Sequence, residues 1–210
     1  MKIIKSVLTE IKKRKFELFK FFLRFFISFL IGGIIVYFVF IFIKNSSYVN
    51  KDLFKNIFDE IKKHLETYFL PYTQKGIFGR IFFIFLNNFR VVVVAGILSF
   101  ITFGIFSEIV AYINGFLVGA VVFSLPLIFE KANPISVFLF GIAPHGIFEI
   151  FAFLLSLTFA HSLSPTKDGI KSIDLYLKSY IIVIPLLFIA SIIEVTFTPF
   201  LLSLFLLKNI

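Results

Sequence analysis

The sequence predicts an all-α fold, a polytopic transmembrane helix bundle of about five spans with amphipathic helices at the membrane surface. Composition carries this prediction. Hydrophobic residues make up 59% of the 210 positions, charged residues only 16%, and phenylalanine alone occupies 34 positions. A soluble domain of this size cannot bury so much apolar surface in one core, whereas lipid accepts it. We therefore expect a multi-pass protein of the cell membrane.

Composition also excludes several classes of site and partner. The chain has no cysteine, which excludes disulfides, a thiolate nucleophile and a cysteine-based metal site. Its formal net charge is +9, which would suggest nucleic acid binding in a soluble protein. Here the basic residues crowd at the borders of apolar runs, where anionic lipid headgroups attract them. We expect membrane lipids as partners and no nucleic acid.

Residues 1–24 predict a basic amphipathic segment on the cytoplasmic face of the membrane. Basic side chains alternate there with Ile, Val, Leu and Phe, which is typical of a helix lying in the interface. The eight basic residues are Lys2, Lys5, Lys12, Lys13, Arg14, Lys15, Lys20 and Arg24. Because Lys and Arg gather on the cytoplasmic side of a span, this segment predicts a cytoplasmic N-terminus.

The first span is predicted over residues 25–43, a run without any charge. At 1.5 Å per residue this run crosses a hydrocarbon layer of about 30 Å. A signal peptide would be shorter and would end in small residues, so we expect a retained anchor. Residues 44–80 then predict an extracytoplasmic segment.

An amphipathic helix is predicted within that extracytoplasmic segment, over residues 51–70. Apolar residues repeat there at helical spacing, while Lys, Asp and Glu occupy the other side. His64 lies among the lysines of this helix, and we interpret it as a solvated surface histidine. Pro71, Gly76 and Gly79 end the helix.

Residues 81–207 predict a four-span transmembrane core. Apolar runs cover about 81–106, 108–129, 135–160 and 179–207. Pro199 could split the last run into two halves and so move the C-terminus to the other side. The location of the C-terminus therefore stays open.

Polar residues inside the spans identify candidate sites, because a charge at bilayer depth costs roughly 2.5–3.5 kcal/mol on insertion scales. They are Asn88 and Arg90 in the second span, Glu108 and Asn114 in the third, His145 and Glu149 in the fourth, and Glu194 in the last. Arg90 lies one turn inside its span and can extend to the interface. Glu108 lies in a tight turn, where a headgroup-level position and a functional role are both open.

Small residues in the third span predict a close helix contact. Ala111, Gly115 and Gly119 recur every four residues and form a ridge that lets another helix approach. We favour packing over substrate contact for this ridge and expect Asn114 to donate a hydrogen bond across it. Together with Gly32 and Gly33 in the first span, the ridge predicts a homodimer or larger assembly.

The fourth span carries the sequence GIAPHGIFEIF at residues 141–151. His145 and Glu149 are four residues apart and can meet on one helix face, where each offsets the other's desolvation. Pro144 should bend the helix just before the pair, and Gly146 either lets a neighbouring backbone approach or leaves room for water. A structural clamp, a proton relay or ligand site, and simple placement at the interface all remain open.

Glu194 stands alone among apolar residues of the last span and needs a partner. His145 or Arg90 from another helix is the natural candidate. We therefore expect one buried cluster of His145, Glu149 and Glu194, lined by Asn88 or Asn114. One histidine and one glutamate on the fourth span fall short of a set of metal ligands, so we expect no metal and no cofactor.

Four segments in this order resemble the stage II sporulation protein M family of bacterial and archaeal membrane proteins. They are NNFRVVVVAG at 87–96, INGFLVG at 113–119, APHGIFEIFA at 143–152 and IIEVTFTP at 192–199. The Pro-His-Gly triplet followed by Glu149 is the most specific element. The resemblance implies the role of the family's sporulation member, a scaffold that holds peptidoglycan-cutting partners at the septal membrane without hydrolase activity.

Two functions remain in competition. The spans contain no nucleophile with a base and orienting group, no HExxH and no phosphate-binding glycine loop, so we expect no enzyme and no catalytic residue. The resemblance favours a membrane scaffold for envelope or membrane-remodelling partners. The His145, Glu149 and Glu194 set favours the alternative, a transporter, channel or lipid-translocating protein.

Overall fold

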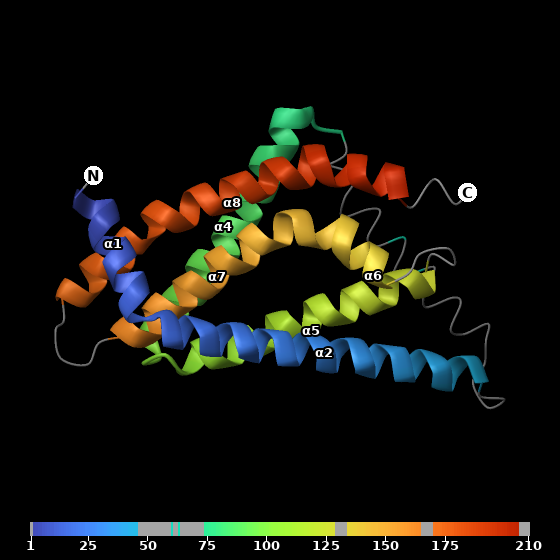
Figure 1. The fold of residues 1–210 in the computed structure, drawn as a ribbon, viewed down its shortest axis with the longest axis horizontal. Coiled ribbons are helices and arrows are strands. Elements are labelled where there is room, and N and C mark those ends of the chain that lie inside the picture. The colour runs from blue at the N-terminus through green and yellow to red at the C-terminus, as the bar shows by residue number, and fades with distance from the viewer. Residues whose placement is uncertain are drawn as a thin grey trace.

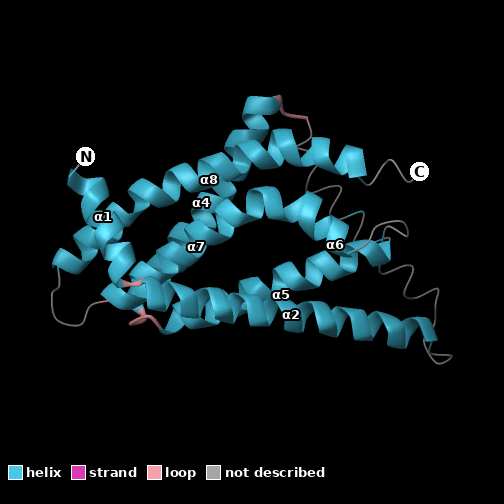
Figure 2. Ribbon diagram, viewed as in Figure 1, coloured by secondary structure: helices cyan, strands magenta, loops and turns pink. Residues whose placement is uncertain are grey.

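The computed structural model describes residues 2–45, 60, 63, 74–128, 134–164 and 170–205. Within these ranges the regular elements are helices and none is a strand (Figures 1 and 2). Five stretches are long and apolar enough to cross a membrane: Lys15–Phe42, Ile77–Ile101, Ile105–Ser124, Val137–Leu163 and Ile173–Leu201. The predicted all-α bundle with five spans is confirmed. The amphipathic helix expected at 51–70, with His64, lies outside the described residues except for Glu60 and Lys63.

The N-terminal part forms two helices with a sharp change of direction at Arg14. Helix α1 covers Lys2–Lys13, and α2 runs without interruption over Lys15–Asn45. Helix α2 thus begins ten residues before the predicted first span at 25–43. The basic residues at its start do not break it, because their long apolar stems can extend along the helix toward the headgroups.

Helix α1 packs against the protein as well as facing outward. It contacts α8 (Ile170–Phe205), and Val7 on its inner face is fully buried. Arg14 donates from Nε to the Ser162 hydroxyl at 2.8 Å, and its guanidinium lies over the Phe159 ring. The predicted interfacial helix is therefore anchored to the end of the bundle.

Helices α2 and α5 (Ile105–Ile128) pack against each other with their backbones in contact. A Cβ atom added at Gly119 would lie 1.9 Å from the Phe29 carbonyl oxygen, and one added at Gly115 would lie 2.2 Å from the Phe25 carbonyl oxygen. Ala111 on the same ridge is fully buried. The small-residue ridge predicted for helix packing therefore faces α2 of the same chain.

The glycines of α2 are used in the same contact. A Cβ atom added at Gly32 would lie 2.3 Å from the Phe116 carbonyl oxygen, and one added at Gly33 would lie 2.5 Å from the Phe123 ring. Both sets of small residues that predicted a homodimer therefore pack in the contact between α2 and α5 of one chain. A second copy would have to use other surfaces.

The hydrogen bond expected from Asn114 across this contact is not formed. Its side-chain amide donates to the Val110 carbonyl of its own helix at 2.9 Å. That carbonyl lies one turn back and is within easy reach of a short side chain. Ser28 makes the bond between the helices instead, donating to the Tyr112 carbonyl.

A second group of helices consists of α4 (Ile77–Ile101), α7 (Ala143–Leu163) and α8. Helices α7 and α8 pack along each other, and α4 contacts both. Helix α8 continues unbroken through Pro185 and Pro199, so the split considered at Pro199 does not occur. It begins at Ile170, nine residues before the predicted last span at 179–207.

The two groups meet at the α4–α5 turn and again where the start of the fourth span contacts α5 (Figure 1). They meet at the short turn between α4 and α5, where Phe103 and Gly104 have positive φ angles of 53° and 84°. There Ser107 donates to the Leu157 carbonyl at 3.4 Å. From this point α7 arches away from α5, and the fourth span returns to α5 at η1 (Val137–Ile142) and α6 (Pro134–Ser136) (Figure 1).

Candidate functional site

The fourth span changes helix type just before the candidate site. Residues Val137–Ile142 form a π-helical turn, η1, and the α-helix α7 begins at Ala143. The Ala143 amide donates to the Phe138 carbonyl, five residues back, and Pro144 lies in the first turn of α7. Proline is tolerated at that position, and π turns inside helices are frequent at functional sites.

This change of helix type gives the bend that Pro144 predicted. Figure 1 shows the span arching between α6 and α7. The predicted kink in a continuous α-helix is therefore a wider π turn followed by a new α-helical start. His145 and Glu149 follow directly after the bend and lie one turn apart on α7.

Two helices bring three ionisable side chains together. His145 and Glu149 come from α7 and Glu194 from α8, and one possible ligand atom of each lies within 4.8 Å of those of the other two. We call these three residues the ion cluster. Each is half-buried, and all three lie within segments able to span a membrane.

Thr198 holds the histidine of the cluster and was not identified from the sequence. Its Oγ1 lies 3.1 Å from His145 Nδ1, and its side chain is buried. The spacing in the sequence could have identified Thr198, because it follows Glu194 by four residues, just as Glu149 follows His145. Two i, i+4 pairs on facing helices therefore form the site.

The ion cluster has more potential negative charge than positive charge. Glu149 and Glu194 are two potential negative charges in the membrane interior, and within the described part of the chain neither pairs with a lysine or an arginine. Two adjacent carboxylates in a medium of low dielectric constant cannot both stay charged without compensation. The site therefore has to hold protons or a bound cation.

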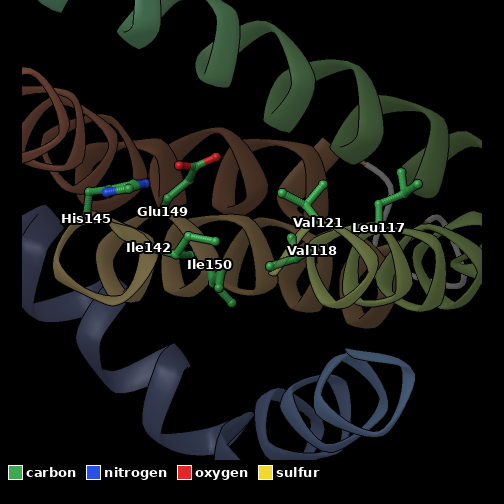
Figure 3. Close-up of a pocket in the computed structure, with 8 residues that line it drawn as sticks. Leu117, Val118, Val121, Ile142, His145, Glu149 and Ile150 are labelled. Atoms are coloured by element: carbon green, nitrogen blue, oxygen red, sulfur yellow. The ribbon is translucent and has the colours of Figure 1, made fainter. Parts of the chain in front are cut away.

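A cavity of about 270 Å³ lies beside the cluster, between α5 and the fourth span. Its walls come from α5 and from the η1–α7 span: Leu117, Val118, Val121, Ile142, His145, Gly146, Glu149 and Ile150. Figure 3 shows His145 and Glu149 next to each other on the cavity side of α7. The polar groups thus line one part of an otherwise apolar space.

Gly146 contributes to this space. A Cβ atom added there would meet only the Ile142 and Ile150 side chains, at 3.2 and 3.9 Å. No backbone from another helix comes within 4 Å of that position in the described structure. Of the two alternatives for Gly146, room beside the pair is the one found.

Three further residues predicted for the cluster come from α4 and α5, and their place in the cluster stays a prediction. Asn88 is half-buried on α4, Arg90 is exposed on the same helix, and Asn114 is on α5. None of them is among the residues that line the cavity. Arg90 is long enough to reach the interface, which removes the need for a buried counter-charge.

A separate polar group joins the helices at the end where they meet. Arg24 Nε donates to Glu108 Oε2 at 2.9 Å, which links α2 to α5. His161 Nδ1 lies 3.2 Å from the Gly104 carbonyl and 3.9 Å from Glu108 Oε1, and Phe21 packs edge-on against its ring. These contacts favour a structural role for Glu108 and for His161.

The family resemblance of the sequence is confirmed. The family model of Stage II sporulation protein M matches residues 21–199, which include the ion cluster and Thr198. No curated protein and no solved structure matches the chain. Because the family model covers most of the sequence, the chain belongs to the stage II sporulation protein M family, and it is an integral membrane protein.

Proposed function

We propose that this protein is a non-catalytic transporter or channel that moves a cation across the membrane by way of the ion cluster. One observation carries the proposal. Three ionisable side chains from two spans converge beside a cavity, without a neutralising lysine or arginine in the described structure. Ionisable groups placed in this way mark ion pathways and proton relays in membrane proteins.

A purely structural clamp accounts less well for the composition of the cluster. His145 and Glu149 alone would offset each other's desolvation, and adding Glu194 brings a second carboxylate next to the first. A glutamine in place of either glutamate could still form hydrogen bonds, and it would remove the repulsion between the two carboxylates. A second carboxylate is useful where a positive ion has to be bound and released.

The cavity between α5 and the η1–α7 span supplies a route to the cluster. Its walls are apolar apart from His145 and Glu149. A π turn and a nearby proline give the fourth span a place to flex. Opening and closing at this hinge would expose the cluster to one side of the membrane at a time.

Ion flux in proteoliposomes tests this proposal. The wild-type protein should carry protons or a metal cation down a gradient, read with ion-sensitive dyes in the lumen. Glu149→Gln and Glu194→Gln should reduce the flux about tenfold or more, since a loss of 1.4 kcal/mol in ion binding already gives that factor. Glu17→Gln is the matched control, because Glu17 pairs with Lys20 on α2, away from the cavity. No flux in the wild type, or full flux in both cluster variants, would overturn the proposal.

A scaffold for envelope or membrane-remodelling partners is the second candidate function. It rests on the family match and on α1, where Ile3, Ile4 and Leu8 stay about half exposed beside the buried Val7. Cross-linking in the native membrane tests it. Partner capture that depends on Leu8 and persists in Glu149→Gln would support the scaffold, and loss of flux with capture intact would favour transport as the role of the cluster.

A further inference from the structure

We propose that the ion cluster binds a divalent transition-metal ion, with His145, Glu149 and Glu194 as its three protein ligands. This inference deepens the proposed function, because it names the class of cation, and its transport consequence rests on that function. The binding site itself rests on geometry and on the chemistry of the donor atoms. Both can be measured without any flux.

The geometry of the cluster is close to that of a coordination sphere. Zinc lies about 2.0–2.2 Å from imidazole nitrogen and carboxylate oxygen, so two ligands of one ion lie roughly 3.0–3.5 Å apart. The donor atoms of the cluster already lie within 4.8 Å of one another. Metal binding would require the donor atoms to move closer together, from within 4.8 Å to roughly 3.0–3.5 Å.

The sequence alone did not predict this site, because His145 and Glu149 gave only two ligands on one helix. Glu194 adds the third ligand from α8, and the two helices pack along each other next to the cluster. Three protein ligands leave further coordination positions open toward the cavity, as in metal sites that exchange their fourth ligand. An open position lets a cation enter and leave.

Charge balance favours a divalent ion. Two carboxylates and one neutral imidazole carry a charge of 2−, which a divalent cation cancels completely. The neutral complex then avoids most of the cost of charge within a membrane. A monovalent cation would leave one negative charge, whereas two protons would also neutralise the site and form the competing occupant.

The imidazole selects among divalent cations. Carboxylate oxygens alone suit Mg²⁺ and Ca²⁺, whereas a nitrogen ligand shifts the preference toward Mn²⁺, Fe²⁺ and Zn²⁺. Thr198 orients the imidazole as a metal ligand. When Nδ1 of His145 donates to the Thr198 hydroxyl, Nε2 of His145 is left free to coordinate the metal. Thr198 is therefore a positioning residue for the histidine ligand.

The His161 and Glu108 pair offers an internal control. These two side chains also lie near each other, at 3.9 Å, but Arg24 already pairs with the Glu108 carboxylate. The positive guanidinium repels a metal ion. A variant at His161 should therefore leave metal binding unchanged.

The test uses the full chain without an affinity tag, in lipid nanodiscs. Calorimetry with Zn²⁺ and Mn²⁺ should show one ion per chain, and Co²⁺ should give the visible absorption of a nitrogen- and oxygen-ligated site. Glu194→Gln and His145→Gln should weaken binding at least tenfold, Thr198→Val should weaken it less, and His161→Gln should not change it. Gel filtration and thermal unfolding identify any variant that fails to fold, and Thr198→Val then decides the test, because it keeps the size of the side chain.

The outcomes separate the two proposals. No metal binding by the wild type, or equal binding by wild type, Glu194→Gln and Thr198→Val, would overturn the metal site. Proton flux that needs Glu149 without metal binding would refute the metal site and leave the transport proposal standing. Metal binding at the cluster without flux of any cation would support the site and refute transport.

Discussion

At the scale of single residues, Gly119 shows how closely the spans are fitted together. The Phe29 carbonyl of α2 occupies the position that a side chain at residue 119 would need. An alanine there has to push two helices apart, and backbone cannot yield as a flexible side chain can. Close approach of this kind stabilises helix pairs in lipid, where apolar burial adds little.

We predict that Gly119→Ala lowers the free energy of unfolding by about 1–3 kcal/mol, the usual cost of overpacking. Thermal unfolding in detergent measures the effect. Gly76→Ala is the control, because a Cβ atom at Gly76 would meet nothing within 4 Å. Equal unfolding temperatures for wild type and Gly119→Ala would contradict the α2–α5 contact described here.

Substitutions at Glu149 should affect stability according to whether they keep the size of the side chain. In the absence of divalent metal, Glu149→Gln keeps the shape of the side chain and removes a charge next to Glu194, so we expect an unchanged or higher unfolding temperature. Glu149→Ala leaves a gap and should lower it. If Glu149→Ala changed neither the unfolding temperature nor ion flux, Glu149 would have no role in the cluster.

At the scale of the elements, α1 is attached to the bundle through a charged network. Burial alone would raise the pKa of Glu10, but hydrogen bonds from Lys13 and Arg14 outweigh it and hold that pKa below the ordinary value of 4.5. The stabilisation is therefore fully present above pH 4.5 and is lost as the pH falls through the lowered pKa. Arg14, released from Glu10, would hold Ser162 and Phe159 less firmly.

We accordingly predict that hydrogen exchange in α1 becomes faster as the pH falls below 4.5, after correction for the intrinsic rate. Glu10→Gln should show faster exchange already at neutral pH and little further change on acidification. The matched control is Glu17→Gln, whose partner Lys20 lies on α2. An identical pH response in wild type and Glu10→Gln would refute this account of the attachment.

The elements also predict the topology. The basic N-terminal segment, the α4–α5 turn and the start of α8 lie at the same end of the bundle (Figure 1), and we expect this end in the cytoplasm. The chain has no cysteine, so single-cysteine variants report cleanly. In right-side-out vesicles an impermeant thiol reagent should label Gln74→Cys and spare Ser6→Cys. The reverse pattern would invert the topology.

Helical periodicity in the sequence predicts part of the candidate site. Spacing placed His145 and Glu149 on one face, and the cost of an isolated charge suggested that Glu194 would join them. Periodicity marks a face but does not say which helix packs against it. The glycine ridge of α5 therefore faces α2 of the same chain, and Asn114 bonds within its own helix.

The π turn at Val137–Ile142 was also beyond prediction from the sequence. Its residues, VFLFGI, are as apolar as those of any span, and proline signals a disturbed helix without specifying its type. Thr198 was overlooked for a related reason. A threonine in a span usually bonds to its own helix, and only the position of α8 against α7 brings its hydroxyl to His145.

At the scale of the whole molecule, two groups of helices hold a polar cluster beside the cavity between α5 and the η1–α7 span. The groups contact each other at the α4–α5 turn and again at η1 and α6, with the π turn in the fourth span between the second contact and the cluster. This arrangement suits a protein in which the fourth span bends at the π turn. The cluster would then meet water from alternate sides.

The central claim is that water reaches the ion cluster through the cavity, and thiol accessibility tests it most directly. Val118 lines the cavity on α5, whereas Val94 is about half exposed on α4 and does not line it. A small cationic thiol reagent reacts only with a thiolate in contact with water. We predict labelling of Val118→Cys and none of Val94→Cys in nanodiscs. Unreactive cysteines at both positions, or equal labelling of both, would contradict the claim.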